Sequence, residues 1–239
     1  MIKEAIVLAG GLGTRLKSVV KDIPKPMADV NGKPFLEYLL RYLRKNSIER
    51  IILSVGYKWE VIRDYFGKSF ENMELVYSVE SEPLGTGGAI KRSLSFVNSD
   101  NVFILNGDTF FDINLKDFLA FHKKRNSVLS VALKSMKQFD RYGVVKIDKD
   151  NRIVAFKEKA YYKFGLINGG IYLLNKLFFR ELNFESKFSF EKDLLEIYYK
   201  VYNFYGFPFE AYFVDIGIPE DYERAKRDFL LVKNNLGLK

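Results

Sequence analysis

Residues 7–16 read VLAGGLGTRL, and this stretch decides how the rest of the sequence is interpreted. It begins within a short apolar run, residues 5–8, that indicates a buried strand. Three glycines then fall within four positions, and Arg15 follows them closely. Because glycine lets backbone N–H groups approach a ligand, a strand ending in such a loop is typical of a phosphate-binding turn in a parallel sheet.

Two common phosphate-binding motifs do not fit this loop. The dinucleotide fingerprint requires a glycine where Leu16 stands, and the P-loop requires a lysine where the sequence has Gly13-Thr14-Arg15. On the glycines alone, a tight turn explains the loop as well as a phosphate cradle does. Residues 24–26, PKP, add a second cation, Lys25, in a segment that proline makes rigid. Two cations near a loop rich in backbone amides favour a triphosphate ligand.

Further motifs follow in order along nearly the whole chain, and with the first they resemble the sugar-1-phosphate nucleotidylyltransferase family. They are EPLGTGG (82–88), NGD (106–108), YGVV (142–145), FKEK (156–159), NGG (168–170) and DIGIP (215–219). The order of these motifs is far more specific than any one of them. The resemblance implies an α/β, Rossmann-like, doubly wound fold with a mixed, mainly parallel sheet and helices on both faces. It also implies transfer of a nucleoside monophosphate from a nucleoside triphosphate to a sugar 1-phosphate, with release of pyrophosphate.

The resemblance assigns roles to particular residues. Arg15 and Lys25 are expected to act in catalysis as phosphate-binding cations, because this reaction depends on positioning and on neutralising charge. Asp108 and Asp215 are expected to hold Mg²⁺, which prefers oxygen ligands. Without the family, a single aspartate after a strand is more often a turn former, and a loop lysine is more often simply solvated. The expected sugar-phosphate contacts are Gly143, Glu158, Lys159 and Asn168, and the expected nucleotide contacts are Leu8, Ala9, Gly10, Gly11, Gly13, Thr14, Arg15, Glu80, Pro83, Gly85 and Thr86.

The segment that reads the base in this family corresponds here to residues 79–86. Guanine offers two adjacent donors on its pairing edge, and an ionised carboxylate such as that of Glu80 can accept both. A glutamine would serve thymine or uracil better, so Glu80 favours GTP. Residues 189–193 (SFEKD) and 215–222 (DIGIPEDY) resemble the compact guanylyltransferases that act on D-glycero-α-D-manno-heptose 1-phosphate. The expected product is GDP-heptose for a bacterial surface polysaccharide. Mannose 1-phosphate as the acceptor, a hexose-1-phosphate uridylyl- or thymidylyltransferase and an inactive sugar-nucleotide-binding regulatory paralogue stay open as alternatives.

The composition fits a globular enzyme. The 239 residues contain no cysteine, which excludes disulfides and thiolate metal sites, and the start of the sequence lacks a signal-peptide pattern. We therefore expect a cytoplasmic location and no membrane span. The formal charge of +8 is spread over predicted helices rather than gathered in blocks, so we expect no nucleic-acid partner. A positive field would still help to collect anionic substrates.

Strand and helix signals alternate through the first half of the chain and are mixed in the second. We expect one domain over residues 1–239, with a nucleotide-binding half to about residue 110 and a sugar-phosphate-binding half after it.

His122 is expected at the surface, and the aromatic residues near 198–205 favour core packing over the face of a homodimer. No room for a hexapeptide-repeat domain is left after Asp228, so no second acyltransferase activity is expected. Strands are expected at 5–8, 51–55, 75–79, 102–105, 128–133, 143–147, 153–156, 171–174 and 211–214, and helices at 34–45, 60–66, 87–96, 190–200 and 219–234.

Overall fold

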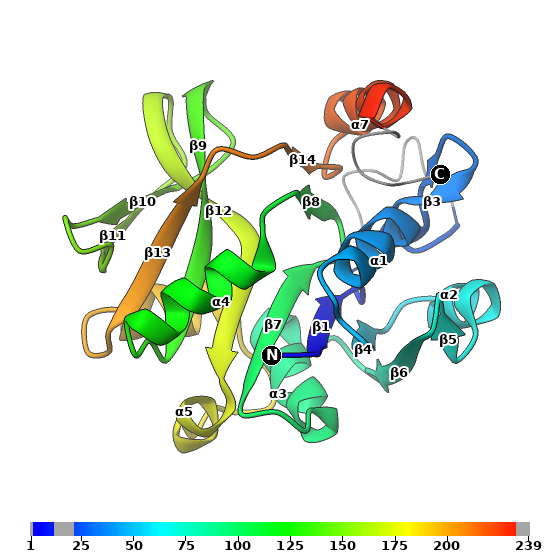
Figure 1. Cartoon of the computed structure of the whole chain (residues 1–239), viewed down its shortest axis with the longest axis horizontal. Coiled ribbons are helices and arrows are strands. Elements are labelled where there is room, and N and C mark those ends of the chain that lie inside the picture. Colours follow the sequence, from blue (N-terminus) through cyan, green and yellow to red (C-terminus); the bar gives the residue numbers. More distant parts are fainter. Residues whose placement is uncertain (1, 12–21, 233–239) are drawn as a thin grey trace.

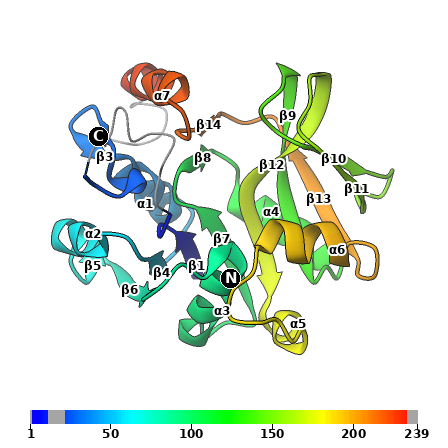
Figure 2. The same cartoon turned by 180° about the vertical axis from the view of Figure 1, so that it is seen from behind.

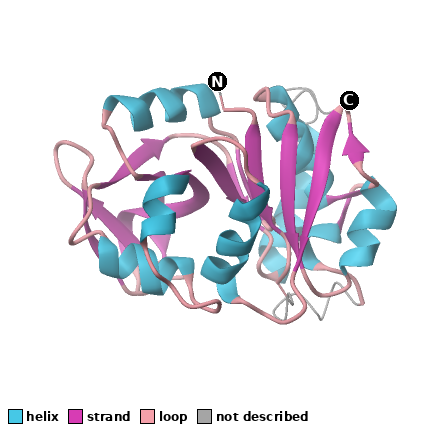
Figure 3. Cartoon of the chain, turned by 90° about the horizontal axis from the view of Figure 1, so that it is seen from below, coloured by secondary structure: helices cyan, strands magenta, loops and turns pink. Residues whose placement is uncertain are grey.

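A computed structural model describes residues 2–11 and 22–232, and its centre is an eight-stranded mixed sheet (Figure 1). The strands lie in the order β13-β9-β12-β7-β1-β4-β6-β5. Helices lie on both faces of this sheet (Figure 3). The strands are β1 (Glu4–Leu8), β4 (Arg50–Val55), β5 (Ser69–Phe70), β6 (Met73–Val79), β7 (Asn101–Asn106), β9 (Leu129–Phe139), β12 (Tyr162–Asn175) and β13 (Phe204–Phe209).

The parallel part of the sheet is built from β1, β4, β6 and β7. Helices α1 (Phe35–Lys45) and α2 (Trp59–Phe66) connect β1 to β4 and β4 to β6, and they bury side chains in the core on one face. Because β7 pairs with the far side of β1, the chain returns across the sheet after β6, and helix α3 (Gly85–Ser93) packs on the opposite face. The direction of winding therefore changes between β1 and β7, which is where ligands bind in such sheets.

The second half of the chain extends the same sheet. β12 runs antiparallel to both β7 and β9, and β13 pairs in parallel with the outer side of β9. Helix α4 (Leu115–Lys124) begins at Asn114, whose side chain accepts backbone N–H groups of the first turn. The remaining helices are η2 (Lys25–Met27), η3 (Leu94–Phe96), α5 (Lys176–Glu181), the π-helix η4 (Phe190–Leu195), α6 (Glu196–Tyr198) and α7 (Pro219–Val232), and the small ladders are β2 (Asp29–Val30) with β3 (Lys33–Pro34), β8 (Thr109–Phe111) with β14 (Phe213–Asp215), and β10 (Val144–Ile147) with β11 (Ile153–Lys157).

Two apolar cores lie on the two faces of the sheet. Helices α1, α4 and α7 pack over one face, and Phe110, Phe118 and Phe229 are buried there. Helices α3, α5 and η4 pack over the other face, which Figure 2 shows from behind, with Phe178 and Phe190 in its core. Both faces of the central strands are covered, so β1, β4 and β7 can be apolar along almost their whole length.

Most of the expected elements are present, with differences in extent. The strands expected at 128–133 and 171–174 are longer, β9 and β12, because the two pair with each other beyond the central sheet. The helix expected at 190–200 begins with the wider turns of a π-helix, and the strand expected at 211–214 is β14, Phe213–Asp215. Strands β2, β3, β5, β8 and β13 and helix α5 were not expected. The end of α7 after Val232 lies outside the described residues.

His122 is not at the surface, as the sequence led us to expect, but is 3% exposed between α4 and the sheet. Its Nδ1 lies 2.9 Å from the Ser130 hydroxyl and its Nε2 lies 3.3 Å from Asn101 Oδ1. The basic residues around it on α4 point to solvent, so the helix is amphipathic and its one histidine falls on the inner face. Within the described residues, no helix is both long and apolar enough to cross a membrane.

Candidate functional site

A cleft of about 790 Å³ opens at the carboxyl ends of β1, β4, β6 and β7. It therefore lies where the direction of winding changes. Residues from the first half of the chain form most of its wall, and Glu191 and Gly217 are contributed by the second half. The expected site residues on this wall are Leu8, Ala9, Gly10, Gly11, Lys25, Glu80, Pro83, Gly85, Thr86 and Asp108.

Glycines let the ends of the central strands approach one another beneath the cleft. The Gly107 N–H donates to the Leu8 carbonyl at 2.9 Å, and a Cβ on Gly107 would lie only 2.6 Å from that oxygen. A Cβ on Gly10 would lie 3.2 Å from Glu80 Oε1, whereas no described residue has an atom within 4 Å of a Cβ built on Gly11. Close packing thus accounts for Gly10, and Gly11 leaves room for a ligand. The expected contacts Gly13, Thr14 and Arg15 lie outside the described residues.

Glu80 presents its carboxylate at the wall of the cleft. Its Oε2 accepts the Leu84 N–H at 3.1 Å, and its Oε1 accepts the Ser54 hydroxyl at 3.3 Å. These two bonds hold the side chain in place between the ends of β4 and β6. A carboxylate has about four acceptor sites, so further lone pairs remain for a ligand. The arrangement suits a ligand edge that carries two adjacent donors.

Two glycines near the start of α3 hold another part of the chain in place. The Gly87 and Gly88 N–H groups both point to the Phe188 carbonyl, at 3.0 and 3.4 Å. A Cβ on Gly88 would lie 2.1 Å from the Ser186 carbonyl oxygen, so only glycine allows this approach. Two of the four backbone donors at this helix end, those of Gly87 and Gly88, are therefore already used by the protein.

Lys25 lies between two carboxylates at the centre of the site. Its ammonium is 2.5 Å from Asp108 Oδ2 and 3.9 Å from Asp215 Oδ1. The antiparallel pairing of β8 with β14 brings the two aspartates together, because it sets Asp215 opposite Thr109. The Lys25 side chain is 10% exposed, on a short helical turn that follows Pro24.

Asp215 is held by two donors and is strongly affected by its charged neighbours. The Gly217 N–H donates to its Oδ1 at 2.7 Å, and the Tyr142 hydroxyl donates to its Oδ2 at 3.4 Å. Burial raises the pKa of Asp215, the charge of Asp108 raises it further, and Lys25 opposes both. Two carboxylates that repel each other across a shared cation form an oxygen-donor set of the kind that binds a hard divalent ion. Among the described residues, no histidine or third carboxylate completes a cage around them.

The expected sugar-phosphate residues fall into two groups. Gly143 precedes β10, and Glu158 and Lys159 follow β11, so the pairing of these two strands brings them together. A Cβ on Gly143 would lie 2.5 Å from the Lys157 carbonyl oxygen. Both Glu158 and Lys159 are exposed, and in the part of the chain that the structure describes neither they nor Gly143 nor Asn168 contributes to the cleft wall.

Asn168 lies at an irregularity of β12. The register with β9 shifts between Asn168 and Tyr172, and Gly170 adopts a φ of +72° there. The Asn168 side chain accepts the Gly170 N–H at 3.0 Å and donates to the Tyr172 hydroxyl at 2.8 Å. Its amide is therefore held at both ends.

Sequence reasoning gave no role to two side chains at this site. Tyr142 precedes Gly143 in a quoted motif, and its hydroxyl connects the start of the β10–β11 hairpin to Asp215. Glu191, in the stretch 189–193, lies on the cleft wall and accepts the Thr86 hydroxyl at 2.7 Å. The motifs that contain them were visible, but no pattern in the sequence shows that residues so distant along the chain meet.

Comparisons with known proteins agree with the family resemblance that the sequence motifs indicate. The family profile described as nucleotidyl transferase matches residues 4–231. The D-glycero-alpha-D-manno-heptose 1-phosphate guanylyltransferase of Aneurinibacillus thermoaerophilus is 50% identical over 94% of this chain and 97% of its own length. The protein of the same name from Campylobacter jejuni subsp. jejuni is 52% identical over 92% of this chain and 96% of its own.

The fold matches solved structures closely. Two crystal structures of HddC from Yersinia pseudotuberculosis, one of them complexed with GMP-PN, are 41% identical to this chain. Each match covers 95% of this chain and 100% of the other, with TM-scores of 0.87 and 0.85. The family profile spans every described residue of the cleft, and the resemblance drawn from the motifs is confirmed: the chain belongs to the nucleotidyl transferase family.

Proposed function

We propose that this protein is a guanylyltransferase that transfers GMP from GTP to D-glycero-α-D-manno-heptose 1-phosphate and releases pyrophosphate. The observation that carries the proposal is the similarity to two heptose-1-phosphate guanylyltransferases, at half or more of the aligned positions and over nearly the full length of both. The product, GDP-heptose, would serve as an activated sugar for a surface polysaccharide. GTP and a sugar phosphate point to the cytoplasm as the location.

Glu80 supports GTP as the nucleotide. Its carboxylate is fixed by Ser54 and the Leu84 N–H and faces the cleft as an acceptor. Guanine places the donors N1–H and N2–H side by side on its pairing edge, and a charged acceptor can bind both. The loop of Ala9, Gly10 and Gly11 would then lie along the nucleotide toward the phosphates.

The reaction needs positioning more than it needs a base. An oxygen of the sugar phosphate, already an anion at neutral pH, attacks the α-phosphorus of GTP, and the bond from that phosphorus to the β-phosphate bridging oxygen breaks. Negative charge gathers on the leaving pyrophosphate, so cations nearby lower the barrier. Lys25 would neutralise charge at the reacting phosphates, and Arg15 would act beside it.

Asp108 and Asp215 fit a divalent metal site. They converge on a single ammonium, their charges repel each other, and their oxygens are the ligands that Mg²⁺ prefers. Bound Mg²⁺ would supply charge neutralisation to the phosphates of GTP. With the carboxylates so engaged, the Lys25 ammonium would be released toward the substrates.

The sugar phosphate is proposed to bind on the side of the cleft where the second half of the chain lies. Lys159 would pair with its phosphate, while Gly143, Glu158 and Asn168 would meet its hydroxyl groups. Tyr142 connects this side to the charged centre, because its hydroxyl donates to Asp215.

The test is pyrophosphate release measured over a grid of four nucleoside triphosphates and three acceptors: heptose, mannose and glucose 1-phosphate. We expect activity with GTP and heptose 1-phosphate and little with other pairs. Activity with GTP and mannose 1-phosphate alone would overturn the sugar assignment but keep the base. Activity with UTP or TTP would overturn the base assignment as well, and no activity with any pair would favour a sugar-nucleotide-binding regulatory protein.

A further inference from the structure

Tyr57 is the one aromatic side chain on the described part of the cleft wall. The chain holds 15 tyrosines, 22 phenylalanines and one tryptophan, and most of these rings pack in or against the two apolar cores. Tyr57 belongs to neither core and is 37% exposed. A lone exposed ring is ordinary on a protein surface, but a ring on the wall of a nucleotide cleft offers a flat face to a base.

The backbone on both sides of Tyr57 is fixed by hydrogen bonds. Before it, β4 ends at Val55, whose carbonyl accepts the Glu80 N–H at 2.8 Å. After it, helix α2 begins, and the Trp59 N–H donates to the Gly56 carbonyl at 3.2 Å. Tyr57 therefore lies on a short turn between a central strand and a helix, beside the segment that carries Glu80.

This turn, the glycine loop and the Glu80 carboxylate meet at one point. A Cβ on Gly10 would lie 3.2 Å from Glu80 Oε1 and 3.4 Å from the Gly56 nitrogen. Gly56 is the residue directly before Tyr57, so the ring projects from the backbone next to the carboxylate that is proposed to read the base. All of these residues line the same cleft.

The order of the strands separates Tyr57 from the charged centre. Asp108 follows β7 and Glu80 follows β6, and strands β1 and β4 lie between these two. The ends of β7 and β6 are therefore three strand spacings apart, roughly 14 Å along the edge of the sheet. Because Tyr57 follows β4, which pairs directly with β6, its ring lies at the Glu80 end of the cleft and away from Lys25.

A neighbouring cation holds one face of the Tyr57 ring. The Lys58 ammonium lies 5.5 Å from the ring centroid, within the range of a cation–π contact. The same ammonium donates to the Asp22 carbonyl at 2.9 Å, which fixes the lysine in place. The ring is thus steadied from one side, and a base would approach its opposite face.

We propose that the guanine ring of GTP stacks on Tyr57 while its pairing edge meets Glu80. The inference rests on the proposed function, because it takes GTP as the nucleotide. Stacking does not depend on the donors and acceptors of a base, so Tyr57 supplies affinity and Glu80 supplies the choice of base. The Tyr57 hydroxyl takes no part in the stack.

Tyr57→Ala removes the ring and leaves Glu80 and the charged centre unchanged. We expect the Kd for GTP, measured by calorimetry in Mg²⁺ without sugar phosphate, to rise about tenfold or more, as loss of one base stack does. The Kd for inorganic tripolyphosphate should stay within about twofold of the wild-type value, because that ligand has no base to stack. Tyr57→Phe keeps the ring and should bind GTP as the wild type does.

Phe96→Ala is the matched control. Phe96 is also 37% exposed, and its carbonyl accepts a hydrogen bond from Arg50 at the end of the sheet opposite the cleft. The variant loses a ring of equal exposure and should bind GTP with the wild-type Kd. Melting temperatures of the three variants, measured alongside, show that each is folded when its Kd is determined.

Three results would overturn the inference. An unchanged Kd for GTP in Tyr57→Ala would show that the base does not stack on the ring. An equal loss in Tyr57→Phe would assign the contact to the hydroxyl, and an equal loss for tripolyphosphate would assign it to the phosphates. Because binding is measured without an acceptor, a protein that binds GTP through Tyr57 but does not turn over heptose 1-phosphate would refute the proposed sugar and leave the stack standing.

Discussion

At the scale of single residues, Glu80 is the side chain on which the choice of nucleotide depends. Glu80→Gln keeps its size but replaces one acceptor oxygen with a donor that faces the donors of guanine. We expect kcat/KM for GTP to fall by a factor corresponding to about 1–3 kcal/mol, the cost of leaving a buried partner unpaired. The measurement is kcat/KM for GTP and for UTP. Equal values in the variant and the wild type for both nucleotides would contradict the role of Glu80.

Asp108 can be changed without loss of the fold, because its backbone rather than its side chain holds the neighbouring strand. Its carbonyl accepts the Ile216 N–H at 3.0 Å, and its side chain is 36% exposed. We expect Asp108→Asn to lower kcat by about two orders of magnitude or more, because the transition state would lose electrostatic stabilisation. The melting temperature should be unchanged. Pyrophosphate release over a Mg²⁺ titration is the measurement, and near-normal activity in Mg²⁺ would remove Asp108 from the metal site.

The residues that sequence could identify were those that carry a motif and a known chemistry. Lys25 and Asp108 lie within recognisable motifs, and in the structure the Lys25 Nζ lies 2.5 Å from Asp108 Oδ2. Glu191 and Tyr142 act through partners distant along the chain, so only the fold shows what they contact. The sequence-based roles of Glu158 and Lys159 stay predictions, since both are exposed near the end of β11.

At the scale of elements, the contact between α4 and the sheet depends on a neutral histidine. Burial, together with the smaller effect of the Lys123 charge, lowers the pKa of His122 to about 4. Since its pKa in the unfolded chain is near 6.5, the unfolded state binds more protons between those values. Stability is therefore complete above about pH 6.5 and falls as the pH drops toward 4, by up to about 3 kcal/mol.

The measurement is the free energy of unfolding between pH 4 and 8 for the wild type and for His122→Gln. The glutamine variant should be less stable at pH 7 and should show a smaller change below pH 6.5. Parallel curves for the two proteins would contradict the assignment to His122.

The close packing of residues 184–188 against α3 depends on the absence of a side chain at Gly88. A Cβ there would lie 2.1 Å from the Ser186 oxygen and 2.8 Å from Leu84 Cβ. We expect Gly88→Ala to destabilise the protein by about 1–3 kcal/mol through overpacking, and to weaken activity because Glu191 follows this segment. The melting temperature of Gly88→Ala is compared with that of Gly11→Ala, where no atom of residues 2–11 and 22–232 lies within 4 Å of the added Cβ. Similar melting temperatures would refute the packing argument.

The elements that sequence missed are those whose form depends on distant pairing. The four residues expected at 171–174 are the end of a strand that starts at Tyr162 and crosses a bulge at Gly170. Local sequence does not show that β9 continues alongside this strand. By contrast, β1, β4 and β7 have an apolar run that is buried on both faces, and they could be predicted with good boundaries.

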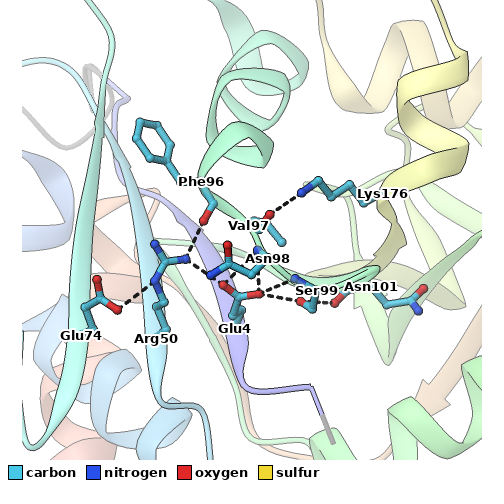
Figure 4. Close-up of polar contacts among 9 residues, drawn as sticks. All are labelled: Glu4, Arg50, Glu74, Phe96, Val97, Asn98, Ser99, Asn101 and Lys176. Carbon is cyan, nitrogen blue, oxygen red and sulfur yellow. Dashed lines mark hydrogen bonds and ion pairs between the residues drawn. The ribbon is translucent and has the colours of Figure 1, made fainter.

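At the scale of the whole molecule, the end of the sheet opposite the cleft is held by an ionic network centred on the buried Glu4 (Figure 4). Glu4 on β1 accepts the Asn98 and Ser99 N–H groups and the Ser99 hydroxyl, and pairs with Arg50 on β4 at 2.8 Å. Arg50 also binds Glu74 on β6. Burial alone would raise the pKa of Glu4, but these bonds outweigh it and hold the pKa below its ordinary value. The network connects three strands and the turn before β7.

Glu4→Gln should therefore lower stability while leaving catalysis intact. An amide nitrogen would face donors that now meet a carboxylate, and we expect a loss of about 2–4 kcal/mol. Glu49→Gln is the matched control, because Glu49 also pairs with a cation at this end but is 52% exposed. Urea unfolding and the two KM values are measured for both variants. A changed KM in Glu4→Gln, or equal losses of stability in the two variants, would contradict the assignment of stability to this end of the sheet and of catalysis to the other.

The pairing of β7 with β12 has a consequence for how the chain is made. During synthesis the strand that carries the motif ending in Asp108 leaves the ribosome long before residues 171–175, its antiparallel neighbour, have been translated. Until then the outer edge of β7 lies open, with Val102, Phe103 and Ile104 in a bare, apolar strand. The nascent chain thus passes through an interval in which a chaperone has a defined segment to protect, and a fragment that ends near residue 110 would keep that edge exposed permanently.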